Sequence, residues 1–242
     1  MRHDQQILDL GVDPVFTFDS LIVGGSNRLA HAAVTGLMTS AATSLILTGG
    51  EGCGKTHLLH AAVGHRQREQ GMDAAAFLDP EALANALEGG GERALTRFLA
   101  RWQDEVLVAV DNLERLGGGS PALQEGLLFL FNHLRGNRGH LLIASRLAPN
   151  HLEWLRPDLR SRLLWGPVME IAPPDDAELE AILSKLTADR QIRLAPELVK
   201  FLCARLPRRI PDLAIALERL DRAGMAQKRP LTVPLAKEIL GL

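Results

Sequence analysis

Short apolar runs alternate with longer stretches of helical periodicity over residues 1–172 of this 242-residue sequence. A short run that is apolar at every position is typical of a strand covered on both faces, and apolar residues three or four apart predict a helix. The expected strands are 45–48, 74–78, 106–110, 140–144 and 168–171. The expected helices begin at a Ser26 cap and after the turn 49–54, and then cover 80–87, 92–102 and 121–134. This alternation predicts a parallel sheet with helices on both faces.

Only helical periodicity follows the Pro173-Pro174 pair. The expected helices of this part cover 175–189, 196–206, 211–226 and 234–240. The sequence therefore predicts an extended tail over 1–14, an α/β domain over 15–172 and a small all-α lid domain over 173–242.

Composition and charge narrow the classes of function. The formal net charge of -2 disfavours a generally basic nucleic-acid binder, so we expect any DNA contact to be indirect or weak. The sequence has 2 cysteines, and its first residues lack the apolar core of a signal peptide. No apolar run approaches the length needed to span a membrane. These features predict a cytoplasmic protein without a membrane partner.

The most informative segment is Gly49-Gly50-Glu51-Gly52-Cys53-Gly54-Lys55-Thr56, between the strand 45–48 and a helical pattern. In a Gly-x-x-x-x-Gly-Lys-Thr loop, backbone N–H groups surround phosphate oxygens at the positive end of the following helix. Lys55 is expected to reach the β- and γ-phosphates, and the Thr56 hydroxyl to bind Mg²⁺. The alternative is a glycine-rich turn with a chance Lys-Thr pair. We expect ADP or ATP here, with contacts from Val23, Gly50, Glu51, Gly52, Cys53, Gly54, Lys55, Thr56 and His57.

Polar residues end the third and fourth expected strands. We expect Asp111 on a strand next to the phosphate-loop strand, where its carboxylate would hold Mg²⁺ through water. Asn112 follows, and its amide positions a water but cannot accept a proton, so hydrolysis by this chain alone is expected to be slow. Ser145 is a candidate contact to the γ-phosphate or the attacking water. Alternatively, Asp111 only caps a loop, and Ser145 is a loop serine without a contact to the nucleotide.

Several further segments resemble a known family. Residues 16–19 and 23–30 resemble the opening of the ATPase domain of the bacterial replication initiator DnaA, and 159–166 is similar to its arginine-finger segment. The segments 220–223, 227–229 and 232–240 resemble the close of the Hda family of DnaA regulators. The resemblance covers nearly the whole chain. It implies an AAA+ P-loop NTPase core followed by an all-α lid.

The resemblance also implies a regulatory function. Arg162 would be an arginine finger that enters the nucleotide site of a neighbouring molecule and stabilises charge on the γ-phosphoryl oxygens. The implied partner is DnaA, whose bound ATP would be hydrolysed so that over-initiation of replication is prevented; a homo-oligomer is a further expectation. The alternative is that Arg160 and Arg162 form surface ion pairs, Arg160 with Asp158.

The N-terminal residues contain a second resemblance. Gln5, Leu8 and Leu10 match the Gln-x-x-Leu-x-Leu pattern with which Hda and polymerase subunits bind the sliding clamp, the β subunit of DNA polymerase III. An extended tail would place the two leucines in an apolar groove while Gln5 forms hydrogen bonds at its rim. Alternatively, Leu8 and Leu10 fold back on the domain.

One position departs from the family pattern. The family has an arginine at the start of a lid helix that points at the phosphates, and alignment puts Pro211 there. Arg208 is the expected replacement, with Arg209 as the alternative. Two other functions stay open. One is a helicase-loader or DNA-remodelling ATPase that binds single-stranded DNA; the other is a stand-alone AAA+ enzyme, which Asn112 disfavours.

Overall fold

The computed structural model describes residues 11–78, 96, 106–116 and 121–242. Every predicted strand is present in it, with ends shifted by at most one residue. The helices and strands of the α/β part are α2 Arg28–Gly36, β1 Ser44–Gly49, α3 Lys55–Gln70, β2 Ala75–Leu78, β3 Leu107–Val110, α5 Pro121–Gly136, β4 His140–Ser145, α6 Pro157–Leu163 and β5 Val168–Ile171. Short 3-10 turns lie at Leu37–Thr39, Met72–Ala74, Leu113–Leu116 and Pro149–His151.

The strands form one parallel sheet in the order β2-β3-β4-β1-β5. Leu142 of β4 pairs with Leu45 of β1 on one side and with Ala109 of β3 on the other. Because all strands run the same way, the carboxyl ends of β1, β4 and β3 meet at one edge of the sheet. The expectation that Asp111 lies on a strand next to the phosphate-loop strand is wrong. β4 comes later in the chain and inserts between these two strands, a long-range pairing that no local pattern reports.

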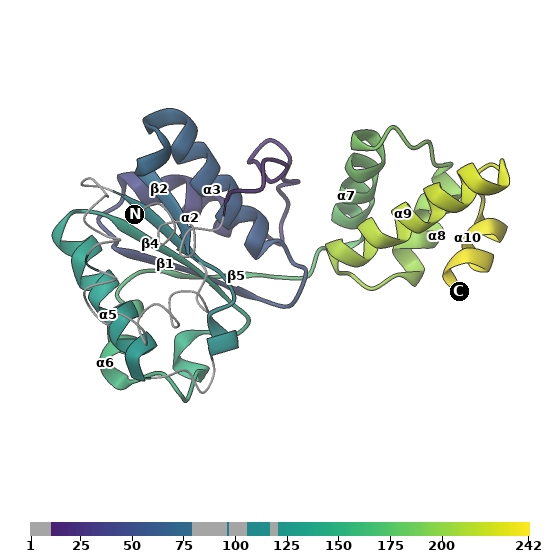
Figure 1. Ribbon diagram of the computed structural model, residues 1–242. Helices are drawn as coiled ribbons and strands as arrows, with labels where there is room; N and C mark the ends of the chain where they lie inside the picture. The colour runs from purple at the N-terminus through teal and green to yellow at the C-terminus, as the bar shows by residue number, and fades with distance from the viewer. Residues whose placement is uncertain (1–10, 79–95, 97–105, 117–120) are drawn as a thin grey trace. The chain divides into compact units, whose positions relative to one another are not determined.

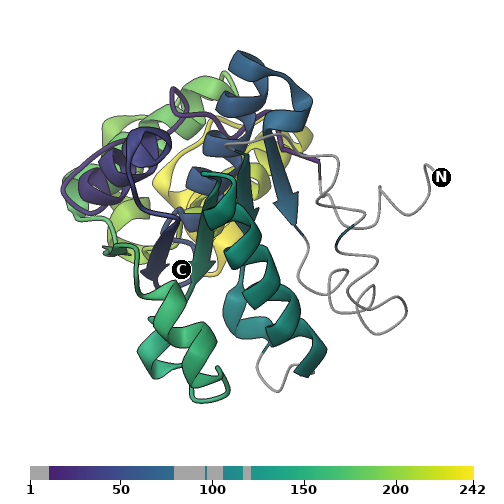
Figure 2. The same cartoon turned by 90° about the vertical axis from the view of Figure 1, so that its left-hand side faces the viewer.

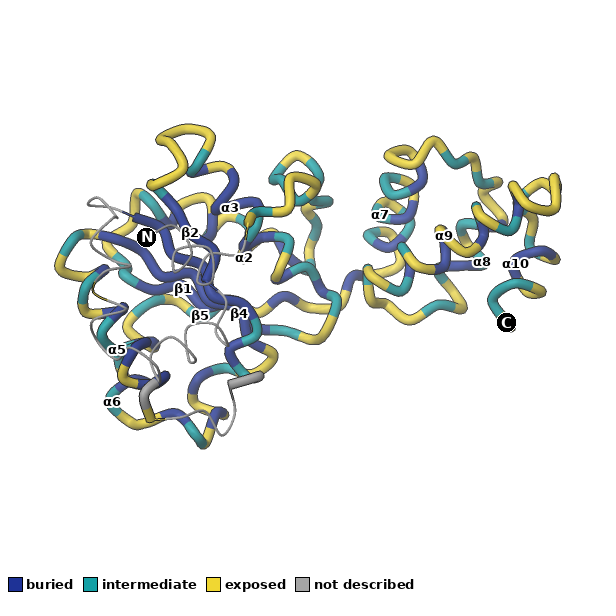
Figure 3. The backbone as a smooth tube through the Cα atoms, viewed as in Figure 1, coloured by how far each residue is buried: buried dark blue, intermediate teal, exposed yellow. Residues whose placement is uncertain are grey.

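Helices cover both faces of this sheet, as Figures 1 and 2 show, with α2 and α3 on one face and α5 and α6 on the other. Leu127 and Phe131 of α5 and Leu159 of α6 join one buried cluster with Ile46 and Val108 of the sheet. β2, β3, β4 and nearly all of β1 are dark blue in Figure 3 because side chains on both of their faces are excluded from water, whereas the edge strand β5 is only partly buried. This double burial explains why the strand sequences are apolar at nearly every position.

Some expected boundaries differ from the structure. The Ser26 cap is wrong: the residue that precedes α2 is Asn27, and the Ser26 N–H donates instead to Glu178 Oε1 at 2.8 Å. The short helix α6 was not among the expected elements. The expected helices 80–87 and 92–102 lie outside the described residues, apart from Thr96, which is helical.

The remaining helices are α7 Asp176–Asp189, α8 Pro196–Arg205, α9 Ile210–Gln227 and α10 Val233–Leu240, each within one residue of its expected bounds. They bury their own apolar cluster, which includes Leu183, Leu202 and Leu217. The chain divides into two compact units, and residues 22–26 and 50–54 belong with 172–242 in the second. The expected fold class, a parallel sheet flanked by helices and followed by a helical lid, is confirmed. Among the described helices, none has the length and apolar character that crossing a membrane requires.

Candidate functional site

The glycine-rich loop between β1 and α3 has the backbone freedom that its sequence predicts. Gly49, Gly52 and Gly54 have φ angles of 144°, 74° and 105°, a region that side chains with a Cβ rarely enter. α3 begins at Lys55, so the N-terminal end of the helix, which carries the positive end of its dipole, faces the loop. Cys53 is buried within the loop. These features suit an anion held by backbone N–H groups.

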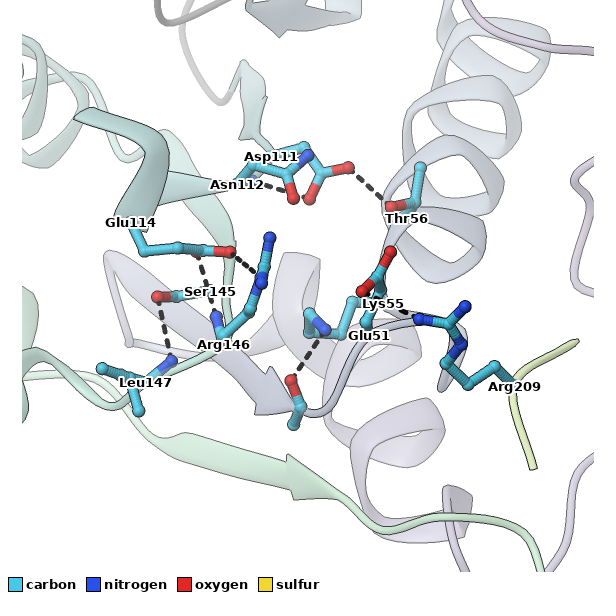
Figure 4. A network of polar contacts seen from close by, with 11 residues as sticks. Glu51, Lys55, Thr56, Asp111, Asn112, Glu114, Ser145, Arg146, Leu147 and Arg209 are labelled. Carbon is cyan, nitrogen blue, oxygen red and sulfur yellow. Dashed lines mark hydrogen bonds and ion pairs between the residues drawn. The ribbon is translucent and has the colours of Figure 1, made fainter. Parts of the chain in front are cut away.

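Lys55 and Thr56 lie at the first turn of α3. Lys55 is only 7% exposed, and its Nζ donates to the Gly49 carbonyl at 2.8 Å. Thr56 Oγ1 donates to Asp111 Oδ2 at 2.6 Å, and Asp111 is itself 7% exposed (Figure 4). Thr56 therefore reaches past β4 to the end of β3. A hydroxyl and a carboxylate in contact are the hard oxygen donors that Mg²⁺ prefers.

Asn112 follows Asp111 in a left-handed conformation, with a φ of 52°. Its N–H donates to Asp111 Oδ1 at 2.7 Å, so each carboxylate oxygen of Asp111 accepts one hydrogen bond. Asn is one of the few residues with a Cβ that adopts this backbone conformation readily. The short turn fixes the direction of the Asp111 carboxylate.

Ser145 and Arg146, at the end of β4, have partners within the protein. Ser145 is fully buried, and its Oγ accepts the Leu147 N–H at 3.3 Å, as in a serine turn. Arg146 makes two bonds of 3.0 Å to Glu114, one from its N–H and one from Nε (Figure 4). Glu114 belongs to no motif and was not among the expected site residues. A phosphate contact from Ser145 stays a prediction.

His57 and Val23 have different surroundings. The His57 ring contacts the Thr17 carbonyl at 2.8 Å and the Ser20 hydroxyl at 3.1 Å through Nε2, and its centroid lies 5.0 Å from that of Phe16. These contacts hold segment 15–21 against α3. Val23 is 47% exposed, which leaves its side chain accessible for an apolar contact with a ligand.

The two candidate lid arginines point to different carboxylates. Arg208 donates to the Pro174 carbonyl at 3.0 Å and to Asp176, both at the start of α7. Arg209 instead pairs with Glu51 of the phosphate loop at 3.1 Å and with Asp212. The hydrogen bond from Arg209 lowers the pKa of Asp212 against the opposing effect of partial burial, and the same bond raises the pKa of Arg209. The arginine beside the loop is thus Arg209, and the Glu51–Arg209 pair was not expected.

The arginines of α6 also differ. Arg160 Nη2 donates to the carbonyls of Leu152 at 2.9 Å and Leu155 at 3.0 Å. The alternative in which Arg160 pairs with Asp158 is wrong, because Asp158 pairs with Arg156 at 2.9 Å. Hydrogen bonds from the Leu159 N–H and from Arg156 lower the Asp158 pKa despite the opposing effect of desolvation.

Arg162 is half-buried, and its Nη1 donates to the carbonyl of Asp158, one turn earlier in the same helix, at 3.1 Å. This bond lies within α6, whereas Arg160 fastens the preceding loop. Gln5, Leu8 and Leu10 lie outside the described residues, so their role stays a prediction.

The sheet order, the Gly-x-x-x-x-Gly-Lys-Thr loop and the helical lid together define a P-loop NTPase core of the AAA+ class. The family model described as the bacterial DnaA ATPase domain matches residues 12–170, and that of the Hda lid domain matches 175–240. The chain belongs to the bacterial DnaA ATPase-domain family.

Individual relatives agree with this family. The chromosomal replication initiator protein DnaA of Cutibacterium acnes is 32% identical over 95% of this chain and 46% of its own length. The DnaA protein of Symbiobacterium thermophilum is 32% identical over 95% of this chain and 51% of its own length. The chain thus spans about half the length of these curated relatives.

Solved structures show the same fold. Domain III of DnaA from Thermotoga maritima has a TM-score of 0.87 and 22% identity, covering 96% of this chain and 98% of that one. AMPPCP-bound DnaA from Aquifex aeolicus has a TM-score of 0.76 and 22% identity. The match covers 89% of this chain and 68% of that one.

Proposed function

We propose that this chain binds ADP or ATP with Mg²⁺ and regulates replication initiation by stimulating hydrolysis of ATP bound to DnaA. The match of 175–240 to the Hda lid domain supports a regulator, and membership of the DnaA ATPase-domain family supports DnaA as the partner. In this proposal the chain supplies Arg162 to the nucleotide site of DnaA. The sliding clamp holds the chain on DNA.

The phosphate loop supports the nucleotide part of the proposal. Backbone N–H groups of Gly50–Gly54 would surround the phosphates, and buried Lys55 would neutralise their charge once it exchanges the Gly49 carbonyl for a phosphate oxygen. Thr56 and Asp111 would hold Mg²⁺, directly and through water respectively. When bound, this ion withdraws charge from the phosphoryl oxygens.

Asn112 affects how fast this chain would hydrolyse the nucleotide in its own site. Its amide has no basic site for a proton from the attacking water, so intrinsic hydrolysis would be slow. A nucleotide that persists in the site would serve to shape the protein for its partner. This favours a regulator over a stand-alone ATPase.

The observation that carries the regulatory part is the contrast between Arg160 and Arg162. Arg160 is tied to the carbonyls of Leu152 and Leu155, and removing it would take one hydrogen-bond donor away from each of these acceptors. Arg162 is half-buried, and its bond to the Asp158 carbonyl can be exchanged without disturbing another segment. Its guanidinium would stabilise charge on the γ-phosphoryl oxygens of ATP held by DnaA.

The test measures phosphate release by DnaA with and without this protein, in the presence of clamp-loaded DNA. Arg162→Ala is expected to lose most of the stimulation, since arginine fingers supply about 10³–10⁵ in rate. Arg156→Ala is the matched control, because Arg156 is an exposed arginine at the start of the same segment. Both variants should keep the nucleotide affinity of the wild-type chain.

Full stimulation by Arg162→Ala would contradict the proposed finger. ATP turnover by the chain alone, unchanged by DnaA, would indicate a stand-alone enzyme. Tight binding of single-stranded DNA without any effect on DnaA would indicate a DNA-remodelling ATPase.

A further inference from the structure

Gln124 of α5 bridges two residues at the point where the chain enters α6. It is only 9% exposed. Its Nε2 donates to the Trp154 carbonyl at 3.0 Å, and its Oε1 accepts the Arg156 N–H at 2.7 Å. α6 begins at Pro157, directly after these contacts. A carboxamide has one atom that donates and another that accepts, so this single side chain holds both residues in a fixed orientation.

Arg160 connects α6 to the same loop. Its Nη2 donates to two carbonyls of the loop 152–155, at 2.9 and 3.0 Å. At the other end of the helix, the Ser44 hydroxyl of β1 donates to the Leu163 carbonyl at 3.1 Å. The direction of α6, and with it the backbone of Arg162, is therefore set by contacts from α5, from β1 and from the preceding loop.

Packing alone does not explain a polar side chain at position 124. Leu123 and Leu127, on the same helix, belong to the buried apolar cluster. The net contribution of a hydrogen bond to stability is small, because bonds to water are lost when it forms. A hydrogen bond does restrict direction, since it weakens steeply when donor and acceptor are misaligned. Gln124 thus specifies where α6 lies more than how strongly it packs.

We propose that Gln124 is a positioning residue for Arg162: by holding the chain at the start of α6, it places the guanidinium at the γ-phosphoryl group of ATP bound to the partner. This inference rests on the proposed role of Arg162 as an arginine finger. The Arg162 side chain is long, so a small turn of α6 moves its guanidinium by on the order of 1 Å, and such a displacement can cost about 10²-fold in rate. Loss of Gln124 therefore slows hydrolysis without weakening the binding of the partner.

The experiment measures phosphate release by DnaA on clamp-loaded DNA over a range of concentrations of this protein. Gln124→Met keeps a long unbranched side chain but loses both hydrogen bonds. Its maximal rate is expected to fall at least about tenfold, while the concentration that gives half of the maximum changes by less than about threefold. Gln67→Met is the matched control, because Gln67 of α3 donates to the Ala75 carbonyl at 2.9 Å on the opposite face of the sheet. It should keep the wild-type maximal rate.

Two further measurements separate positioning from a general structural defect. In an Arg162→Ala background, Gln124→Met should have no additional effect, because it acts through that arginine. Hydrogen exchange followed by mass spectrometry should be faster over 154–158 in Gln124→Met and unchanged there in Gln67→Met. If Gln124→Met does not fold, Gln124→Leu takes its place with the same expected results.

A full maximal rate with Gln124→Met, together with a loss in Arg162→Ala, would overturn this inference and leave the arginine finger in place. Equal losses from Gln124→Met in the wild-type and Arg162→Ala backgrounds would assign Gln124 a merely structural role and overturn the inference too, as would unchanged hydrogen exchange over 154–158. Full stimulation by Arg162→Ala would overturn the proposed finger together with this inference.

Discussion

The Thr56 hydroxyl links the phosphate loop to the far side of β4. It donates to Asp111 at 2.6 Å, and the left-handed turn at Asn112 supplies the second donor to the same carboxylate. Because Asp111 is buried, loss of either donor leaves a charged oxygen poorly solvated. One side chain therefore serves both the folded state and the proposed metal site.

Thr56→Val tests this double role. The valine keeps the shape but removes the hydroxyl, so affinity for nucleotide in Mg²⁺ is expected to fall at least about tenfold, and the free energy of unfolding by about 1–3 kcal/mol. Nucleotide titrations with Mg²⁺ and with EDTA check the first effect, and denaturant unfolding checks the second. Thr56→Ser retains the hydroxyl and should behave as wild type. Equal Mg²⁺ dependence in the valine variant would refute the assignment.

At the scale of single residues, the sequence allowed the prediction of those site residues that are marked by their spacing from a strand. Lys55, Thr56 and Asp111 were recognisable because each stands at a fixed distance from an apolar strand. The Glu51–Arg209 pair joins residues separated by 158 positions, and the choice of Arg209 over Arg208 depends on how the chain bends before α9. Neither feature leaves a local pattern.

Among the elements, α7 has a first turn that is fastened on two sides. Asp175 caps the helix by accepting from the Glu178 N–H, and Glu178 accepts in return from the Asp175 N–H and from Ser26. A Cβ on Gly24 would overlap the Glu178 carboxylate, whereas one on Gly25 would lie at an ordinary 3.7 Å. A larger residue at position 24 would therefore displace the Glu178 carboxylate from its place at the helix start.

Glu178 makes a pH-dependent contribution to stability. Desolvation opposes its ionisation, but hydrogen bonds from Ser26 and Asp175 outweigh this effect and lower its pKa from the ordinary 4.5. The contribution is thus fully present above that value and is lost as pH falls through the lowered folded-state pKa. Glu178→Gln should melt about 2–4 °C below wild type at pH 7, as expected for a capping loss of about 1 kcal/mol.

This difference in melting temperature should shrink as the pH falls from 4.5 through the lowered pKa of Glu178, because wild-type Glu178 then becomes neutral as well. Scanning calorimetry between pH 7 and pH 3 provides the measurement. Glu180→Gln, two residues further along α7, is the matched control and should follow wild type. A pH-independent difference for Glu178→Gln would rule out ionisation as the cause.

The helices and strands were predictable wherever burial imposes a recognisable pattern of apolar residues on the sequence. Strands such as 106–110 are apolar throughout because they are covered on both faces, and the lid helices carry clear amphipathic stripes. α6 has 7 residues, too few for periodicity to be distinctive. Ser26 has the side chain of a cap, but its N–H serves Glu178, a tertiary contact that overrides the local signal.

For the whole molecule, the proposed tether lies in the first ten residues. Replacing Leu8 and Leu10 together by Ala is expected to abolish capture by the sliding clamp, because two buried leucines contribute about 1.5–3 kcal/mol each. A pull-down with purified clamp provides the measurement. Replacing Arg2 and His3 by Ala provides the control, since neither belongs to the pattern.

Nucleotide affinity should be the same in all these tail variants. Undiminished clamp capture after loss of both leucines would exclude the tail as the tether. The finger proposal would remain intact, because it depends on Arg162 alone.

The position of β4 has a consequence for how this site tolerates change. Thr56 follows β1 and Asp111 follows β3, and these strands lie two places apart in the sheet. The distance between the two strands is roughly 9.5 Å at ordinary strand spacing. That separation is set by main-chain hydrogen bonds through the intervening strand, not by the connecting loops. Insertions in those loops can therefore accumulate while the hydroxyl and the carboxylate stay at bonding distance.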